Sequence, residues 1–388
     1  MIFQQQLRIP GPTPLPERVV RAMQRPLVDH RGPEFKAVLD EIVPNLKKVF
    51  GTETADMLLL TCSGTGGLES AVANLVSPGD QVIVALCGNF GERFVSLNKA
   101  YGAEVVQLEA EWGQPVDAAD LADVVAAHPA AKLVFLTHNE TSTGLTNPLQ
   151  QLARVARDAG RVVVVDGVSS VGSMPAEMDA WGVDVLISGS QKGWMAPPGL
   201  AFMAVGPRAW ELQREARSPR FYFDWTKLRD EIAKGATPYT PAVGVAFAVQ
   251  EGLRMLFEEG LENVYRRHRV IADACAAALD AAGFRLFAAE GYRSATVTAA
   301  LPPEGLEVAA FRTLLREKYG VIIAGGQAKM SGKMIRVGHL GAVSVGDLVQ
   351  VLWAMEQALE ELDIRPADGR TLAAAGLVLA QEATPALA

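Results

Sequence analysis

The stretches VVVVDGVSSVG (residues 162–172) and VDVLISGSQKG (residues 183–193) decide the fold of this chain. Each begins with a short, largely apolar run, 162–165 and 183–187, of the length and β-branched composition typical of a buried strand. Asp166 follows the first run directly, and Lys192 lies just beyond the second. Because ligands bind outside the carboxyl ends of strands in an open parallel sheet, we expect this carboxylate and this amine to meet at one sheet edge.

A carboxylate and an amine in this arrangement suit the cofactor pyridoxal phosphate (PLP). PLP needs a lysine that forms a Schiff base with its aldehyde, and an acid that keeps its ring nitrogen protonated so that the ring acts as an electron sink. A simpler interpretation is that Asp166 caps a helix and that Lys192 is a solvated loop residue. The two residues alone leave both interpretations open.

The composition excludes several classes of protein. The chain has 388 residues, enough for two domains at about 150 residues each, with 49% hydrophobic and 21% charged residues as in a soluble globular protein. A net charge of −8 without a basic block argues against nucleic acid, and no apolar run approaches the roughly 18 residues of a membrane span. Three scattered cysteines and the lack of a secretory signal predict a cytoplasmic location, and no metal-binding spacing of His or Cys is present, so no metal is expected.

The order of the expected elements predicts an α/β fold. Strands alternate with helices from residue 57 to residue 205, which is typical of a doubly wound, mainly parallel sheet. After about Thr240 the pattern changes to long helices and shorter strands, typical of a smaller α+β domain. We therefore expect an N-terminal arm, a large domain, a small C-terminal domain and a flexible tail, at residues 1–16, 17–258, 259–365 and 366–388.

Two glycine-rich motifs follow other strands of the expected sheet. TCSGTGG (residues 61–67) opens a helix, and a glycine-rich helix N-terminus is suited to phosphate, although a plain capped turn would look the same. It matches neither GxxxxGK[ST] nor GxGxxG, so a nucleotide is disfavoured. GNFG (residues 88–91) places Phe90 where it could stack on a heteroaromatic ring or simply join the core.

Two further motifs offer groups to a cofactor or substrate. THNETSTG (residues 137–144) is either a capped turn or a source of hydrogen bonds to a ring oxygen. Arg336 ends the expected strand around residues 334–337, and its planar guanidinium fits a carboxylate of a substrate or of an internal salt bridge.

Taken in order, these motifs extend over nearly the whole chain, which resembles the class V, fold-type I PLP-dependent aminotransferases, most of all the alanine–glyoxylate and serine–pyruvate branch. The fold that this resemblance implies has a large domain with a mainly parallel sheet of the seven-stranded type, followed by a smaller C-terminal α+β domain. The motifs that carry it are GPTP at 11–14, SGTG at 63–66, NFG at 89–91, THxExSTG at 137–144, Asp166, SGSQK at 188–192 and RxG at 336–338.

The resemblance assigns a role to each site residue. Lys192 would form the Schiff base and move the proton, Asp166 would pair with the pyridinium nitrogen, and Arg336 would bind the substrate carboxylate. The family is homodimeric with shared active sites, so a partner subunit would contribute to the phosphate site, with Thr240 our choice. The remaining expected cofactor contacts are Phe90 and Val168 on the ring, Thr141 near its O3′, and Ser63, Gly64, Thr65 and Gln191 on the phosphate.

The function implied is a ping-pong transfer of an amino group from alanine, serine or a similar amino acid to glyoxylate or pyruvate. An aspartate or phosphonate donor is the main alternative, although no second arginine is clearly placed for it and Arg31 has no assigned role. A lyase or desulfurase is disfavoured because residues 320–336 hold no nucleophilic cysteine. A non-catalytic protein on this fold is disfavoured because Lys192 and Asp166 are both present.

Overall fold

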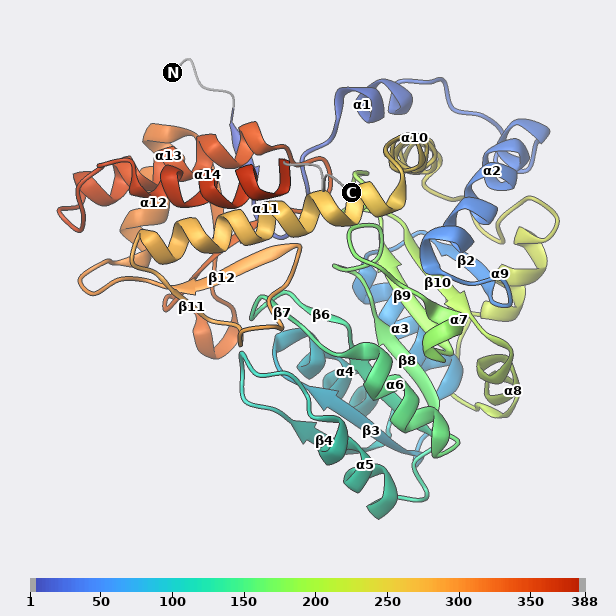
Figure 1. The fold of residues 1–388 in the computed structure, drawn as a ribbon. Helices are drawn as coiled ribbons and strands as arrows, with labels where there is room; N and C mark the ends of the chain where they lie inside the picture. Colours follow the sequence, from blue (N-terminus) through green and yellow to red (C-terminus); the bar gives the residue numbers. More distant parts are fainter. Residues whose placement is uncertain (1–4, 384–388) are drawn as a thin grey trace, which may run out of the picture.

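The computed structural model describes residues 5–383, drawn in Figure 1, and its largest element is a seven-stranded sheet. Strand β10 is antiparallel to both of its neighbours, β2 and β9, and the other strand pairs are parallel, which confirms the expected mainly parallel sheet. In spatial order the strands are β2 (Asp56–Leu60), β10 (Ala201–Val205), β9 (Val185–Gly189), β8 (Val162–Asp166), β5 (Leu133–Thr137), β3 (Gln81–Leu86) and β4 (Glu104–Glu109).

Helices cover both faces of this sheet, which is why its central strands are apolar throughout rather than alternating. Two separate buried clusters, one on each face, form the core of this part of the chain. One face is covered by α3 (Gly64–Leu75), α4 (Asn89–Ala100), α8 (Pro207–Glu215) and α9 (Trp225–Ile232). The other is covered by α2 (Pro33–Phe50), α5 (Ala118–Ala127), α6 (Leu149–Asp158), α7 (Met178–Trp181) and α10 (Val243–Glu259), with α1 (Glu17–Met23) on the outside of α10.

The register of the central strands sets the position of the polar residues that follow them. Asp166 on β8 lies opposite Thr137 on β5 and Ile187 on β9, so β5 and β8 end at one level of the sheet and β9 continues to Gly189. Strand β9 begins later than the expected residue 183, because the Asp184 carboxylate accepts the backbone N–H of Val163 and ends the loop there. The short pair β6 (Asn139–Glu140) and β7 (Leu145–Thr146) follows β5 at this same edge.

A second, five-stranded sheet is formed mainly by the C-terminal part of the chain. Helices α11, α13 and α14 lie on the side of β11 and β12 that faces away from β3 and β4 (Figure 1). The strands in order are β1 (Gln6–Arg8), β13 (Val321–Gly325), β14 (Ile335–Gly338), β12 (Val297–Leu301) and β11 (Arg285–Leu286), and the helices are α11 (Leu261–Ala281), α12 (Val308–Tyr319), η1 (Ala328–Met330), α13 (Val345–Glu361) and α14 (Arg370–Ala383). We propose that the chain divides into domains near residue 259, where α10 gives way to α11, because each sheet has its own buried core.

Within the described residues, the N-terminal arm and the segment after residue 365 are more structured than expected. Within the N-terminal arm, β1 joins the second sheet in parallel with β13, and Arg8 forms a salt bridge of 2.7 Å with Asp347. We expected a flexible tail after residue 365, but residues 370–383 form α14, which packs on α11 and buries Thr371 and Ala375. Within residues 5–383, no helix is long and apolar enough to cross a membrane.

Candidate active site

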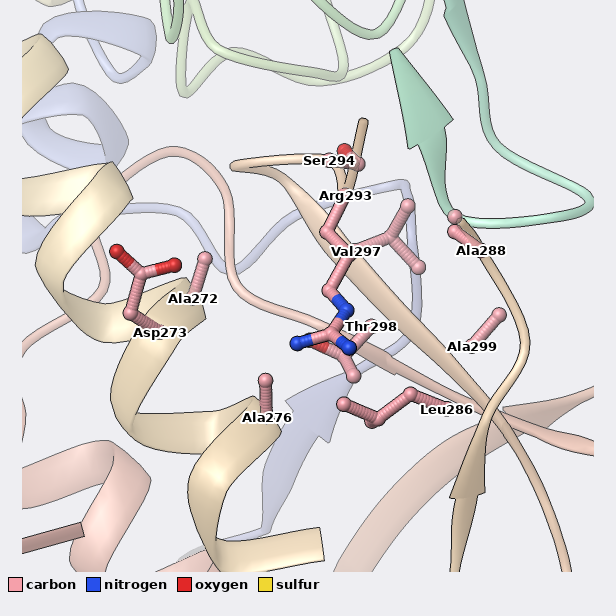
Figure 2. A pocket seen from close by; sticks show the side chains of 11 residues that line it. Ala272, Asp273, Ala276, Leu286, Ala288, Arg293, Ser294, Val297, Thr298 and Ala299 are labelled. Carbon is pink, nitrogen blue, oxygen red and sulfur yellow. The ribbon is translucent and has the colours of Figure 1, made fainter. Parts of the chain in front are cut away.

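Two hollows near the junction of the sheets differ greatly in size. The first lies between α11 and β12, with Arg293 extending between them, and its volume of about 10 Å³ would hold roughly one water (Figure 2). The second is an open cleft of about 500 Å³ at the end of the large sheet, lined by Phe90, Thr141, Lys192 and Arg336. Three residues expected to contact the cofactor and one expected to bind the substrate therefore share one cleft large enough for a small metabolite.

Lys192 lies in the loop after β9 and is almost fully buried, at 9% exposed. Its Nζ donates a hydrogen bond to the backbone carbonyl of Pro10, and Thr13 contacts the same loop through its backbone N–H and its hydroxyl. Gly11 has φ +127°, and a Cβ there would lie 2.5 Å from Lys192 Nζ. The N-terminal arm therefore packs directly on this lysine, and only glycine fits at the closest approach.

Burial brings the pKa values of Lys192 and Asp166 towards neutrality. Burial lowers the pKa of Lys192 to about 8, with the positive charges of Arg336 and Arg93 adding to this and Asp166 opposing it. Burial raises the pKa of Asp166 to about 6, opposed by the backbone N–H of Val168 and by Arg93 and Lys192. Each group thus affects the other, although no salt bridge within 4.0 Å joins them. The predicted pair therefore shares one site without direct contact.

The Asp166 carboxylate uses one oxygen within the protein. Its Oδ1 accepts the backbone N–H of Val168 at 2.9 Å, and among residues 5–383 no hydrogen bond to Oδ2 is found. The Val168 side chain packs on the start of α3, where a Cβ on Gly64 would lie 3.0 Å from it. Asp166 is therefore fixed in orientation with one oxygen left for a ligand.

The predicted phosphate site is the N-terminus of α3. Ser63 is its N-cap, and its Oγ accepts the backbone N–H of Gly66 at 3.4 Å. Gly64 and Thr65 supply first-turn N–H groups, which a helix leaves without intrahelical partners. The Gln191 side chain lies close by, because a Cβ on Gly189 would lie 3.1 Å from its Oε1 and 3.5 Å from Gly64 Cα.

Gln191 also provides an unpaired polar group at this helix end. Its Oε1 is buried and has no hydrogen-bond partner. Buried polar groups normally have a partner. Rotation of the amide would place its NH₂ group at the same position, where it could donate to an anion.

Sequence reasoning missed Arg93, three residues after Phe90 on α4. Its guanidinium lies over the Phe90 ring, 4.7 Å from the centroid, and its Nη1 donates to Thr65 Oγ1 at 2.9 Å. Its charge reaches the site, because it lowers the pKa of both Asp166 and Lys192. The signal available in the sequence was its spacing from Phe90, which puts both residues on one helix face.

Sequence reasoning also gave no role to Glu140, which fixes the start of α4. Its buried carboxylate accepts the backbone N–H groups of Phe90 at 3.0 Å, Gly91 at 3.2 Å and Ser142 at 3.0 Å, and the Ser142 hydroxyl at 2.5 Å. Burial raises the pKa of this carboxyl. Glu140 thus fixes the backbone at Phe90 through this hydrogen bond.

Thr141 lines the cleft, whereas its neighbour Asn139 does not. The Thr141 hydroxyl donates to Ser169 Oγ at 2.7 Å. The Asn139 amide donates to the same Ser169 oxygen at 2.9 Å and to Thr296 Oγ1 at 3.0 Å. The Asn139 amide N–H groups are therefore used within the protein, and only Thr141 is placed to contact a ligand in the cleft.

Arg336, on β14, lines the opposite side of the cleft. Its Nε donates to the carbonyl of Gly325 at 2.8 Å, and its Nη1 donates to the carbonyl of Thr141 at 3.1 Å and to Gln327 Oε1 at 3.2 Å. Burial lowers the pKa of this guanidinium to about 10. The side chain is thus rigidly held by neutral oxygens, which leaves its charge without a carboxylate partner.

Two candidate residues lie elsewhere on the chain. Thr240 is exposed, in the segment that precedes α10, and does not line the Lys192 cleft. Its expected role concerns a partner subunit, so it stays a prediction. Arg31 lies in a separate surface hollow with Phe221 and Tyr239, which places it outside the cleft of Lys192.

Comparison with known proteins links this chain to one family. Residues 7–346 match the family model described as aminotransferase class-V. A soluble hydrogenase 42 kDa subunit of Anabaena cylindrica is 41% identical over 359 residues, covering 92% of this chain and 93% of that protein. L-aspartate–glyoxylate aminotransferase of Paracoccus denitrificans is 37% identical over 382 residues, covering 97% and 96%. Among solved structures, ureidoglycine–glyoxylate aminotransferase from Bacillus subtilis has a TM-score of 0.92 at 29% identity, covering 98% of this chain and 99% of that one.

Proposed function

The chain belongs to the class-V aminotransferases, which are PLP-dependent enzymes, and we propose that it moves an amino group from a small amino acid, such as alanine or serine, to glyoxylate. The observation that carries this proposal is the buried pair Lys192 and Asp166 at one sheet edge, where Lys192 lines the same cleft as Arg336. The acceptor is supported by two similar proteins, whose names share glyoxylate while their amino donors differ.

The residues at the sheet edge fit PLP. When bound, this cofactor supplies an aldehyde that reacts with amines and a ring that takes up electrons. The free N-terminus of α3 and the unpaired buried amide of Gln191 support phosphate binding by Gly64, Thr65, Ser63 and Gln191. The free Asp166 oxygen supports its assignment to the ring nitrogen.

Lys192 would hold the cofactor's carbonyl carbon covalently and, when released by the substrate amine, move the proton of the substrate Cα. Its lowered pKa supports this role, because an amine with a pKa near the working pH can both take up and release a proton. Phe90 and Val168 would contact the ring, with Phe90 held by Glu140, and Thr141 would reach the O3′ side.

Arg336 would bind the substrate α-carboxylate. Its fixed orientation and its lack of an acidic partner support this role, since a planar guanidinium can hold both carboxylate oxygens. We also propose a homodimer in which Thr240 reaches the phosphate of the partner's site, and a cytoplasmic location, which the scattered cysteines support.

The test is a coupled assay of the purified protein with PLP, glyoxylate and a panel of amino donors including alanine and serine. We expect glycine to form together with the keto acid of the donor. Formation of no glycine with any donor of the panel would contradict the proposal. Glycine formation by a variant in which Lys192 is replaced would contradict the role of that lysine.

A further inference from the structure

Thr141 lines the cleft of Lys192, and its hydroxyl proton is already used inside the protein. Its Oγ1 donates to Ser169 Oγ at 2.7 Å, and both side chains are buried. In the described part of the chain, the Thr141 hydroxyl has no other hydrogen bond. Because a hydroxyl has one proton and two lone pairs, Thr141 can offer a ligand in the cleft only its lone pairs.

The direction of this hydrogen bond is set by Ser169. The Ser169 hydroxyl donates its own proton to the backbone carbonyl of Asn139 at 3.0 Å, and a carbonyl can only accept. The Asn139 amide donates to the same Ser169 oxygen at 2.9 Å. Ser169 therefore has no proton left for Thr141, and Thr141 must be the donor between the two hydroxyls.

Asn139, which holds Ser169, is itself held between the two sheets. Its amide donates to Oγ1 of Thr296, a fully buried residue directly before β12 of the second sheet, at 3.0 Å. Its Oδ1 accepts the hydroxyl of Thr146 on β7 at 3.0 Å. Rotation of Ser169 away from Asn139 would leave buried polar groups without a partner, which costs stability. The direction of the Thr141 hydrogen bond is therefore built into the fold.

We propose that Ser169 is a positioning residue that makes Thr141 a hydrogen-bond acceptor towards PLP, so that Thr141 binds the ring hydroxyl of the cofactor in its protonated form. An O–H group can meet the Thr141 lone pairs, whereas a deprotonated ring oxygen would face them with no proton between. The hydrogen bond therefore favours the neutral ring hydroxyl over its anion. This inference rests on the proposed function and adds to it the direction of one hydrogen bond.

Charged groups around the cleft also act on a ring hydroxyl. Those that line the cleft are Lys192, Arg312, Arg316 and Arg336. Nearby are the buried acids Glu140 and Asp166, and Arg93 on α4. All of them are present in every variant compared below. A difference between the variants therefore reports on the Thr141 hydrogen bond and not on these charges.

The test uses pyridoxine 5′-phosphate, which has the ring, hydroxyl and phosphate of the cofactor but an alcohol in place of the aldehyde, and so forms no bond to Lys192. The full-length apo-proteins are saturated with this probe, and the absorbance of the bound ring against pH gives the pKa of its hydroxyl. The variants are Ser169→Ala, Thr141→Val and the double variant. Ser170→Ala is the matched control, because the buried Ser170 hydroxyl donates to the carbonyl of Gly167 at 3.3 Å and not to Thr141.

We expect Thr141→Val to lower the pKa of the bound ring hydroxyl by about 0.5–1, because a hydrogen bond that favours the neutral form is lost. Ser169→Ala should lower this pKa by about 1–2, because the freed Thr141 proton can then be donated to the ring anion. The double variant should match Thr141→Val, since Ser169 acts only through Thr141. Ser170→Ala should match the parent protein.

A higher pKa of the ring hydroxyl in Thr141→Val would show that Thr141 donates to the ring oxygen, and it would overturn the inference. An unchanged pKa in Ser169→Ala would overturn it as well. If Ser169→Ala does not fold, the direction of the change in Thr141→Val still decides the question. A parent protein that does not bind the probe would contradict the proposed cofactor site and this inference with it, whereas binding with the same hydroxyl pKa in all the proteins would overturn the inference alone.

Discussion

Two groups of residues at the end of the large sheet differ in their balance of charge. The sheet-edge region, formed by Phe90, Arg93, Glu140, Asp166 and Lys192, combines two acids with two cations. The arginine region, formed by Arg312, Arg316 and Arg336, contains cations alone. A site with its own counter-charges suits a ligand that stays bound, whereas a site that lacks them is completed by an anion that comes and goes. The difference separates a cofactor side from a substrate side.

The most direct way to break this comparison is to remove the amine of the sheet-edge region. We expect Lys192→Ala to lower turnover by about 10⁴-fold or more, because both covalent attachment and proton transfer are lost. Lys99→Ala, at an exposed position of α4, is the matched control and should retain activity. The measurement is steady-state turnover with alanine and glyoxylate, and comparable turnover in the two variants would contradict the division into two regions.

Removing the acid should separate activity from stability. We expect Asp166→Asn to lower kcat by about 10²- to 10³-fold, the scale seen when one preorganised electrostatic group is lost. Burial raises the pKa of Asp166 from 3.8 to about 6 in the folded chain. Above this pH the buried charge therefore destabilises the folded state, and this cost is absent below pH 3.8. The apo-protein of this variant should therefore unfold with a free energy on the order of 1–3 kcal/mol higher at pH 7.5.

Urea unfolding of the two apo-proteins measures this difference, and steady-state assays measure kcat. Asp166→Glu is the companion variant, because it keeps the charge and should keep more activity than the amide. A less stable apo-protein with unchanged kcat would show that Asp166 is a structural residue, and the sheet-edge region would then lose its counter-charge.

In the arginine region we expect a smaller effect, mainly on binding. Arg336→Ala should raise KM for the amino donor by about 10- to 100-fold and lower kcat less, because the α-carboxylate loses a bidentate partner. Arg336→Lys keeps the charge without the planar fork and should give an intermediate KM. Steady-state kinetics with alanine measures both, and an unchanged KM in Arg336→Ala would remove this residue from the substrate side.

The smallest expected effect is a pH dependence that sharpens the charge assignment. With the pKa of Lys192 lowered to about 8, the neutral fraction of the amine rises from about 0.1 at pH 7 to about 0.5 at pH 8. The rate at which the apo-protein takes up PLP should therefore rise about fivefold over this interval, rise about twofold further to pH 9 and level off above that. Stopped-flow absorbance measures the rate. A rise that continues without levelling towards pH 10 would indicate a lysine with its ordinary pKa of 10.5.

The sequence predicted residues whose position depends on strand order alone. Asp166 is the last residue of β8, and Lys192 and the start of α3 come shortly after the ends of β9 and β2, so their meeting at one edge follows from strands that run in the same direction. Arg336 was predicted at the end of a strand; it lies instead within β14, which continues to Gly338, and it lines the cleft. These residues share a simple link between local pattern and three-dimensional position.

Residues whose position depends on contacts between distant elements were missed. Glu140 acts on the start of α4 across about 50 residues of chain, and Arg312 reaches Gly325 only because α12 packs beside β13. No periodic pattern encodes such contacts. Helix α14 was predicted as a flexible tail because of its alanine content, although the apolar spacing of Leu372, Ala375 and Leu379 was a helical signal.

The central claim, that PLP is held covalently by the amine at the sheet edge, is tested most directly by borohydride reduction of the holoenzyme followed by peptide mass spectrometry. We predict that the reduced cofactor is found on the peptide that contains Lys192, and that this adduct disappears when an excess of amino donor is added before reduction. An adduct on another lysine, or no adduct on a protein that contains the cofactor, would contradict this account.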